Sequence, residues 1–155
     1  MQENNKLLYI LRGVSGIGKS AYATNLNSKV LSTDDFFTNK GGDYIFLAGL
    51  LPCAHLWNYI RTLNAMANNE PKICIDNTNI ELWEMKDYVI ASQEYHYNTK
   101  IIEFSVPPGI TSKDLFKRSK HNVPIAVIEK MITNYSKTKR ATIEQILNSK
   151  KPINK

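Results

Sequence analysis

The chain has 155 residues, of which 43% are hydrophobic, and a formal net charge of +6 at pH 7. A chain of this size buries an adequate core without disulfides or a structural metal, and Cys53 and Cys74 lack the spacing of a zinc site. The modest positive charge favours a polyanionic partner. We find no signal-peptide pattern and no long apolar run, so we expect a cytoplasmic or nuclear protein that is neither secreted nor in a membrane.

The predicted elements alternate between strands and helices. Strands are expected at residues 6–11, 29–37, 73–75 and 100–106, and helices at residues 20–26, 47–68, 81–95, 112–120 and 125–137. This alternation predicts βαβ units and an α/β fold in which helices cover both faces of a parallel sheet. We expect one domain over residues 1–155, with its core at about 7–135 and a Lys-rich end at 136–155.

The segment LRGVSGIGKSAY, residues 11–22, fits the phosphate-loop pattern G-x-x-x-x-G-K-[ST]. A glycine-rich turn exposes successive backbone N–H groups that bind phosphate. Lys19 is expected to reach the β- and γ-phosphates of ATP from a solvated position, and the Ser20 hydroxyl to bind Mg²⁺. The predicted ATP-binding residues of this loop are Gly13, Val14, Ser15, Gly16, Ile17, Gly18, Lys19, Ser20 and Ala21.

Polar clusters follow the second and third predicted strands. Asp34-Asp35 ends the second, and residues 76–79, Asp-Asn-Thr-Asn, follow the third. In a parallel sheet the ligand lies at the carboxyl ends of the strands, so these clusters are expected beside the phosphate loop. Two alternatives stay open: one of the Asp34-Asp35 pair caps a helix, and residues 76–79 form a turn and cap, in particular Asn79.

Five segments in this order, GVSGIGKS, STDDFF, AHLWNYIR, IDNTNIELWEM and LFKRSKHNVP, resemble the polynucleotide 5′-kinase group of P-loop phosphotransferases. The resemblance covers about residues 7–135. It implies a P-loop kinase-type three-layer α/β/α fold with a mainly parallel sheet and a short helical lid. It also implies ATP and Mg²⁺ as cofactors and transfer of the γ-phosphate to a nucleic-acid hydroxyl, the 5′-OH of RNA or DNA.

The resemblance also implies roles for single residues. Asp34 accepts the proton of the 5′-hydroxyl, and Arg118 in the lid contacts the ATP phosphates; with Lys19 they form the expected catalytic set. On a helix from about Ser112, Leu115 and Phe116 are expected to face the body of the protein, and the alternative for the basic residues of this segment is a solvated helix face. The expected substrate-binding residues are Asp35, Asp76, Asn77, Thr78, Asn79, Lys120 and His121.

The acceptor hydroxyl is not fixed by these patterns. Related P-loop kinases act on a modified base in DNA, on an aminoacyl group of tRNA or on a small metabolite, and an ATP-binding switch without transfer is a further alternative. A pure switch has no need of Asp34. A single-stranded nucleic acid partner calls for an aromatic platform, for which Tyr44, Phe46 and Trp57 are candidates, although each also suits a core. No obligate protein partner is indicated.

Overall fold

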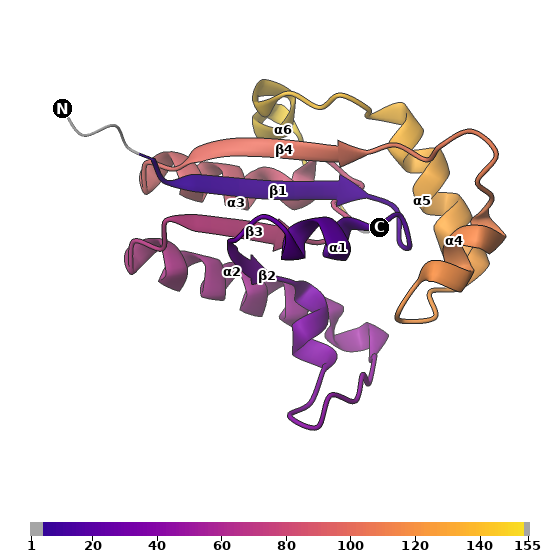
Figure 1. Cartoon of the computed structure of the whole chain (residues 1–155). Coiled ribbons are helices and arrows are strands. Elements are labelled where there is room, and N and C mark those ends of the chain that lie inside the picture. The colour runs from indigo at the N-terminus through magenta and orange to yellow at the C-terminus, as the bar shows by residue number, and fades with distance from the viewer. Residues whose placement is uncertain (1–4, 154–155) are drawn as a thin grey trace.

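The computed structural model describes residues 5–153 as an α/β fold (Figure 1). None of the helices in this range is long and apolar enough to cross a membrane. In chain order the elements are β1 (Leu7–Gly13), α1 (Lys19–Thr24), β2 (Lys29–Leu31), the 3₁₀ helices η1 (Thr33–Phe37) and η2 (Ala48–Leu50), α2 (Leu51–Ala67), β3 (Lys72–Asp76), α3 (Trp83–Glu94), β4 (Asn98–Phe104), α4 (Ser112–Arg118), α5 (Ile125–Lys137) and α6 (Ile143–Asn148).

The four strands form one sheet in the order β2-β3-β1-β4, and every pair is parallel. The predicted α/β/α class with a parallel sheet is therefore confirmed. Leu11 of β1 is in register with Asp76 of β3, so the phosphate loop after β1 and residues 76–79 after β3 begin at the same edge. Parallel pairing thus brings together the polar segments that the sequence separates by more than fifty residues.

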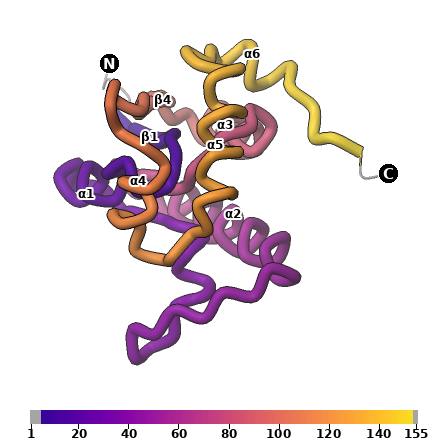
Figure 2. Tube along the Cα trace, turned by 90° about the vertical axis from the view of Figure 1, so that its right-hand side faces the viewer, coloured from indigo at the N-terminus to yellow at the C-terminus, as the bar shows by residue number. Residues whose placement is uncertain are grey.

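Alternating side chains of the strands pack against different helices. One sheet face, with Leu8, Ile10, Ile73 and Ile75, packs with buried residues of α2, α3 and α6. The other face, with Leu11 and Cys74, packs against Ala23 of the short helix α1. A third apolar cluster lies beyond the strand ends, where α4 and α5 cross in front of the sheet edge (Figure 2); it contains Val14, Ile80, Leu115, Ile128 and Tyr135.

One predicted strand was wrong in extent. The strand expected over residues 29–37 ends at Leu31, because Ser32 caps a 3₁₀ helix that holds both aspartates. The helix expected within residues 47–68, with Pro52 near its start, begins at Leu51 after η2, so this start is confirmed. The helix α6 was not predicted, although Ile146 is buried in the main core beside α3.

The helix α2 buries polar as well as apolar residues. Its regularly spaced Leu56 and Ile60 are 59% and 48% exposed, whereas Asn58 and Thr62 are fully buried. The Asn58 amide donates to the Leu31 carbonyl at 3.4 Å and to the Tyr88 hydroxyl at 3.2 Å. These hydrogen bonds satisfy a buried polar group that would otherwise be costly, and they fix α2 against β2 and α3.

A buried arginine joins the segments at the sheet edge. All five N–H groups of Arg12 in β1 donate hydrogen bonds. Nε donates to the Asn79 carbonyl at 2.8 Å, and Nη1 donates to Glu103 Oε1 at 2.9 Å and to the Thr138 carbonyl at 2.5 Å. Nη2 donates to the Ile80 carbonyl at 2.6 Å and to the Thr138 hydroxyl. The guanidinium is fully buried, so each of these partners offsets part of its desolvation.

Glu103 of β4 completes this arrangement. Its carboxylate accepts hydrogen bonds from the backbone N–H groups of Arg140 at 2.7 Å and Ala141 at 2.9 Å as well as from Arg12. Burial raises the pKa of this carboxyl, but the two backbone donors and the arginine outweigh it, so the pKa lies below its usual value. The end of α5 is thereby attached to β1 and β4.

We predict that Glu103→Gln lowers the free energy of unfolding at pH 7 by about 3 kcal/mol, because it leaves the buried Arg12 charge without its counterion. A depressed carboxyl pKa stabilises the fold above the unfolded-state pKa, and this contribution is lost as the pH falls through the folded-state value. The difference between wild type and variant should therefore shrink below about pH 4.5 in urea denaturation. Glu94→Gln, at an exposed site, is the control and should change stability little at either pH.

Candidate active site

The phosphate loop lies between β1 and α1. Gly16 and Gly18 have φ values of 82° and 105°, in the left-handed region that glycine tolerates without strain. The Lys19 ammonium donates to the Val14 carbonyl at 2.9 Å inside the loop. The expectation that Lys19 is solvated was wrong, because its exposed fraction is 8%. Burial lowers its pKa to about 8, although the carboxylates of Asp76 and Asp34 oppose the decrease.

Ser20 and Asp76 form a pair of oxygen ligands beside this loop. The Ser20 hydroxyl, in the first turn of α1, donates to Asp76 Oδ2 at 2.8 Å, at the end of β3. Hydroxyl and carboxylate oxygens are the donors that Mg²⁺ prefers, and Mg²⁺ commonly keeps waters and substrate phosphates as its other ligands. No cluster of three or more His, Cys, Asp or Glu residues occurs within residues 5–153, so the two residues fit a phosphate-bound Mg²⁺ rather than an all-protein cage.

The two aspartates of η1 have different surroundings. Asp35 completes a capping box with Ser32, and Arg61 donates to its Oδ2 at 2.8 Å. Asp34 takes no part in this cap through its side chain. Its Oδ1 instead accepts a hydrogen bond from the Tyr44 hydroxyl at 3.2 Å, and its Oδ2 lies 3.5 Å from His121 Nε2. This geometry favours a structural role for Asp35 and leaves the half-exposed Asp34 carboxylate for chemistry.

Residues 77–79 connect the phosphate loop to η1. The Asn77 side-chain oxygen accepts from the backbone N–H of Thr33 at 2.9 Å, and the Thr78 carbonyl accepts from the N–H of Gly13 at 2.9 Å. The Asn79 amide donates to the Leu11 carbonyl at 2.7 Å, and this residue is only 2% exposed. Burial therefore favours the turn alternative for Asn79. Substrate contacts of Asn77 and Thr78 stay predictions.

The predicted lid, residues 111–124, forms the helix α4 and the loop that leads to α5. Leu115 is buried and Phe116 packs partly against the same cluster, as predicted. A capping box of Thr111 and Asp114 begins α4, which ends at Arg118. The side chains of Lys117, Arg118 and Lys120 are exposed, and within the described part of the chain Arg118 has no hydrogen bond or ion pair. The loop after α4 brings His121 to Asp34.

Comparisons with known proteins decide the family. Residues 8–138 match the family model described as an AAA domain, AAA_33. The chain belongs to this family of P-loop kinases. It is also 37% identical over 136 residues to human NEDD4-binding protein 2, covering 84% of this chain but only 8% of that protein.

Solved structures agree with the fold of this AAA_33 domain. A chain of the Pnkp1/Rnl/Hen1 RNA repair complex superposes with a TM-score of 0.69 and 25% identity, over 89% of this chain and 46% of that one. A second structure of a Pnkp1/Rnl/Hen1 complex gives a TM-score of 0.56 at 23% identity, over 79% and 43%. The domain thus spans less than half of the length of these relatives. It has the fold of the P-loop kinases.

The structure adds residues to the AAA_33 site that sequence reasoning missed. Arg12 precedes the phosphate loop, and its only sequence signal is a charge within an apolar strand. The contact of Asp76 with Ser20 was not anticipated, and the expected contact of Asp76 with the acceptor stays a prediction. Tyr44 was considered as a stacking residue, and its contact with Asp34 had no sequence signal.

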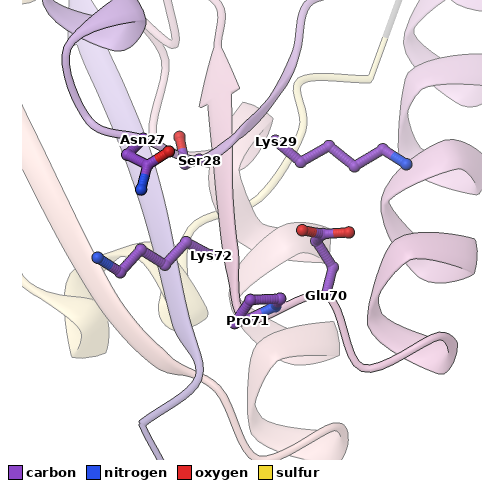
Figure 3. Close-up of a pocket in the computed structure, with 6 residues that line it drawn as sticks. All are labelled: Asn27, Ser28, Lys29, Glu70, Pro71 and Lys72. Atoms are coloured by element: carbon purple, nitrogen blue, oxygen red, sulfur yellow. The ribbon is translucent and has the colours of Figure 1, made fainter.

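A surface hollow of about 400 Å³ lies at the opposite edge of the sheet, at the start of β2 and β3. Figure 3 shows that its two lysine side chains, Lys29 and Lys72, point away from one another. They do not converge on a ligand, so the hollow does not compete with the phosphate-loop edge. Its lining residues are Asn27, Ser28, Lys29, Glu70, Pro71 and Lys72.

Gly16 sets the distance between the phosphate loop and the lid. A Cβ atom at Gly16 would lie 2.2 Å from the Leu115 carbonyl oxygen, so Gly16→Ala forces the loop and α4 apart. We expect a loss of unfolding free energy of about 1–3 kcal/mol and a roughly 10-fold or greater loss of ATP affinity in calorimetry. Gly49→Ala is the matched control, because nothing lies within 4 Å of its added Cβ. Equal behaviour of the two variants would contradict the prediction.

Proposed function

We propose that this chain is an ATP- and Mg²⁺-dependent kinase that transfers the γ-phosphate to the 5′-OH of RNA or DNA. The proposal rests on the different contacts that three carboxylates at the sheet edge make. Asp76 is paired with Ser20 and Asp35 with Arg61, whereas the half-exposed Asp34 carboxylate contacts the Tyr44 hydroxyl and His121. A general base must have such an accessible carboxylate beside the position of the reacting hydroxyl.

The proposed reaction is an in-line phosphoryl transfer. Asp34 accepts the proton of the 5′-hydroxyl as its oxygen forms a bond to the γ-phosphorus, and the bond from that phosphorus to the bridging oxygen breaks to release ADP. Lys19 stays charged beside the phosphates, and the exposed Arg118 at the end of α4 supplies a planar guanidinium for two phosphate oxygens. Ser20 and Asp76 would hold Mg²⁺, which neutralises charge on the β- and γ-phosphates.

Two observations support a polymeric acceptor. The Asp34 side chain is 52% exposed, whereas a small-molecule site encloses most of its ligand. The lid also presents exposed positive charge near His121, which contacts Asp34. This charge can bind a phosphate backbone and comes from Lys117, Arg118 and Lys120. The likeness to a chain of an RNA repair complex is in keeping with such an acceptor.

Transfer from γ-labelled ATP to a set of acceptors tests the proposal. With Mg²⁺ present, we expect label on 5′-OH oligoribonucleotides or oligodeoxyribonucleotides, and none on the same strands with a 5′-phosphate. Binding of the oligonucleotide should weaken steeply as salt rises, because neutralised phosphates release counterions. If only free nucleosides or another metabolite were labelled, the acceptor would be a small molecule and not a polynucleotide. ATP binding without any transfer would favour the ATP-binding switch.

The two aspartates of η1 should respond differently to loss of charge. Asp34→Asn is expected to lower kcat by roughly 10²-fold or more while ATP affinity is kept, because it removes the base. Asp35→Asn should lower the free energy of unfolding by about 1 kcal/mol, because it weakens the Arg61 pair and the cap. Steady-state kinetics and urea denaturation of both variants distinguish the roles. A reversed pattern would show that Asp35 is the base.

A further inference from the structure

Three aromatic side chains lie in a row beside Asp34. The Tyr44 and His121 rings stack with their centroids 3.8 Å apart and their planes at 23°. The Phe46 ring is nearly parallel to Tyr44, at 9°, with a centroid distance of 6.4 Å. We call these three residues, Phe46, Tyr44 and His121, the aromatic row.

Ring packing and backbone hydrogen bonds hold the aromatic row in place. The buried Phe37 packs edge-on against both Tyr44, at 6.2 Å, and Phe46, at 5.0 Å. Thr38 pairs with Tyr44 in an antiparallel bridge, and the N–H of Ile45 donates to the Phe37 carbonyl at 2.8 Å. The segment that carries Tyr44 and Phe46 is therefore held by its backbone as well as by ring packing.

One end of the row contacts the proposed base directly. The Tyr44 hydroxyl and His121 Nε2 approach the two oxygens of Asp34, at 3.2 and 3.5 Å. A group attached to a hydroxyl at Asp34 must therefore lie next to these rings. Phe46, at the far end, is 50% exposed and has a free ring surface. Trp57 differs, because Arg61 lies over its ring at 3.9 Å and Phe36 packs against it.

We propose that the aromatic row is a stacking platform for the base of the acceptor's terminal nucleoside, with the exposed ring of Phe46 as its main contact. This inference rests on the proposed function, since it assigns the binding of the same 5′-OH acceptor. Stacking on an aromatic side chain accepts every base, because each base has a π-face. The platform therefore recognises that a base is present and does not select its identity.

The test compares two single-stranded acceptors of equal length, one with a normal 5′-terminal nucleoside and one with a 5′-terminal abasic residue that keeps the 5′-OH. For wild type, the abasic end should raise the acceptor KM roughly 10-fold with little change in kcat. Phe46→Ala should raise the KM of the normal acceptor by a similar factor and leave that of the abasic acceptor unchanged. Phe46→Trp should restore the wild-type KM, and Leu47→Ala, at an exposed neighbouring site, should have no effect.

The outcomes separate this inference from the proposed function. If wild type labels neither acceptor, the 5′-kinase function fails and the platform fails with it. If wild type labels both acceptors with equal KM, the kinase function stands and the platform is wrong. A Phe46→Ala variant that raises the KM of both acceptors equally would also overturn the platform, because its effect would not depend on a base.

Discussion

The buried guanidinium of Arg12 is the constraint on which the arrangement of the site depends. A charge without solvent is tolerated only when its donors are satisfied, and all five N–H groups of Arg12 have acceptors. These acceptors belong to the turn after β3, to β4 and to the end of α5. The strand that leads into the phosphate loop is therefore fixed to three segments that are distant in the sequence. Glu103 extends the same network to residues 140 and 141.

The relative positions of the site residues depend on this and neighbouring hydrogen bonds. Thr78 attaches the turn after β3 to Gly13, and Asn77 attaches it to Thr33, so the phosphate loop and the 3₁₀ helix of Asp34 keep a fixed separation. The lid approaches from the other side, with the Leu115 backbone against Gly16 and His121 at Asp34. The nucleotide and acceptor positions that we propose thus lie between elements that share one set of hydrogen bonds, which is what a reaction dependent on positioning requires.

Local patterns made the fold and the position of the phosphate loop predictable. The phosphate loop has a short, specific spacing, and the helix at residues 125–137 was predicted with the observed bounds. The remaining features depend on distant contacts: Arg12 finds its partners 67, 91 and 126 residues away. Tertiary hydrogen bonds also override the apolar pattern of α2, so Asn58 is buried while Leu56 is exposed. The cap alternative for Asp34-Asp35 is confirmed for Asp35, which forms a capping box with Ser32, whereas the capping box at Thr142 is a local signal that sequence reasoning overlooked.

A crystal structure with a non-hydrolysable ATP analogue, Mg²⁺ and a 5′-OH oligonucleotide is the most direct measurement of the central claim, that Asp34 activates a polynucleotide end. The account predicts the 5′-oxygen within about 2.6–3.2 Å of the Asp34 carboxylate and in line with the γ-phosphate. It also predicts Mg²⁺ at Ser20 and Asp76. A 5′-oxygen bound away from Asp34, or an Asp34 carboxylate directed away from the γ-phosphate, would contradict it.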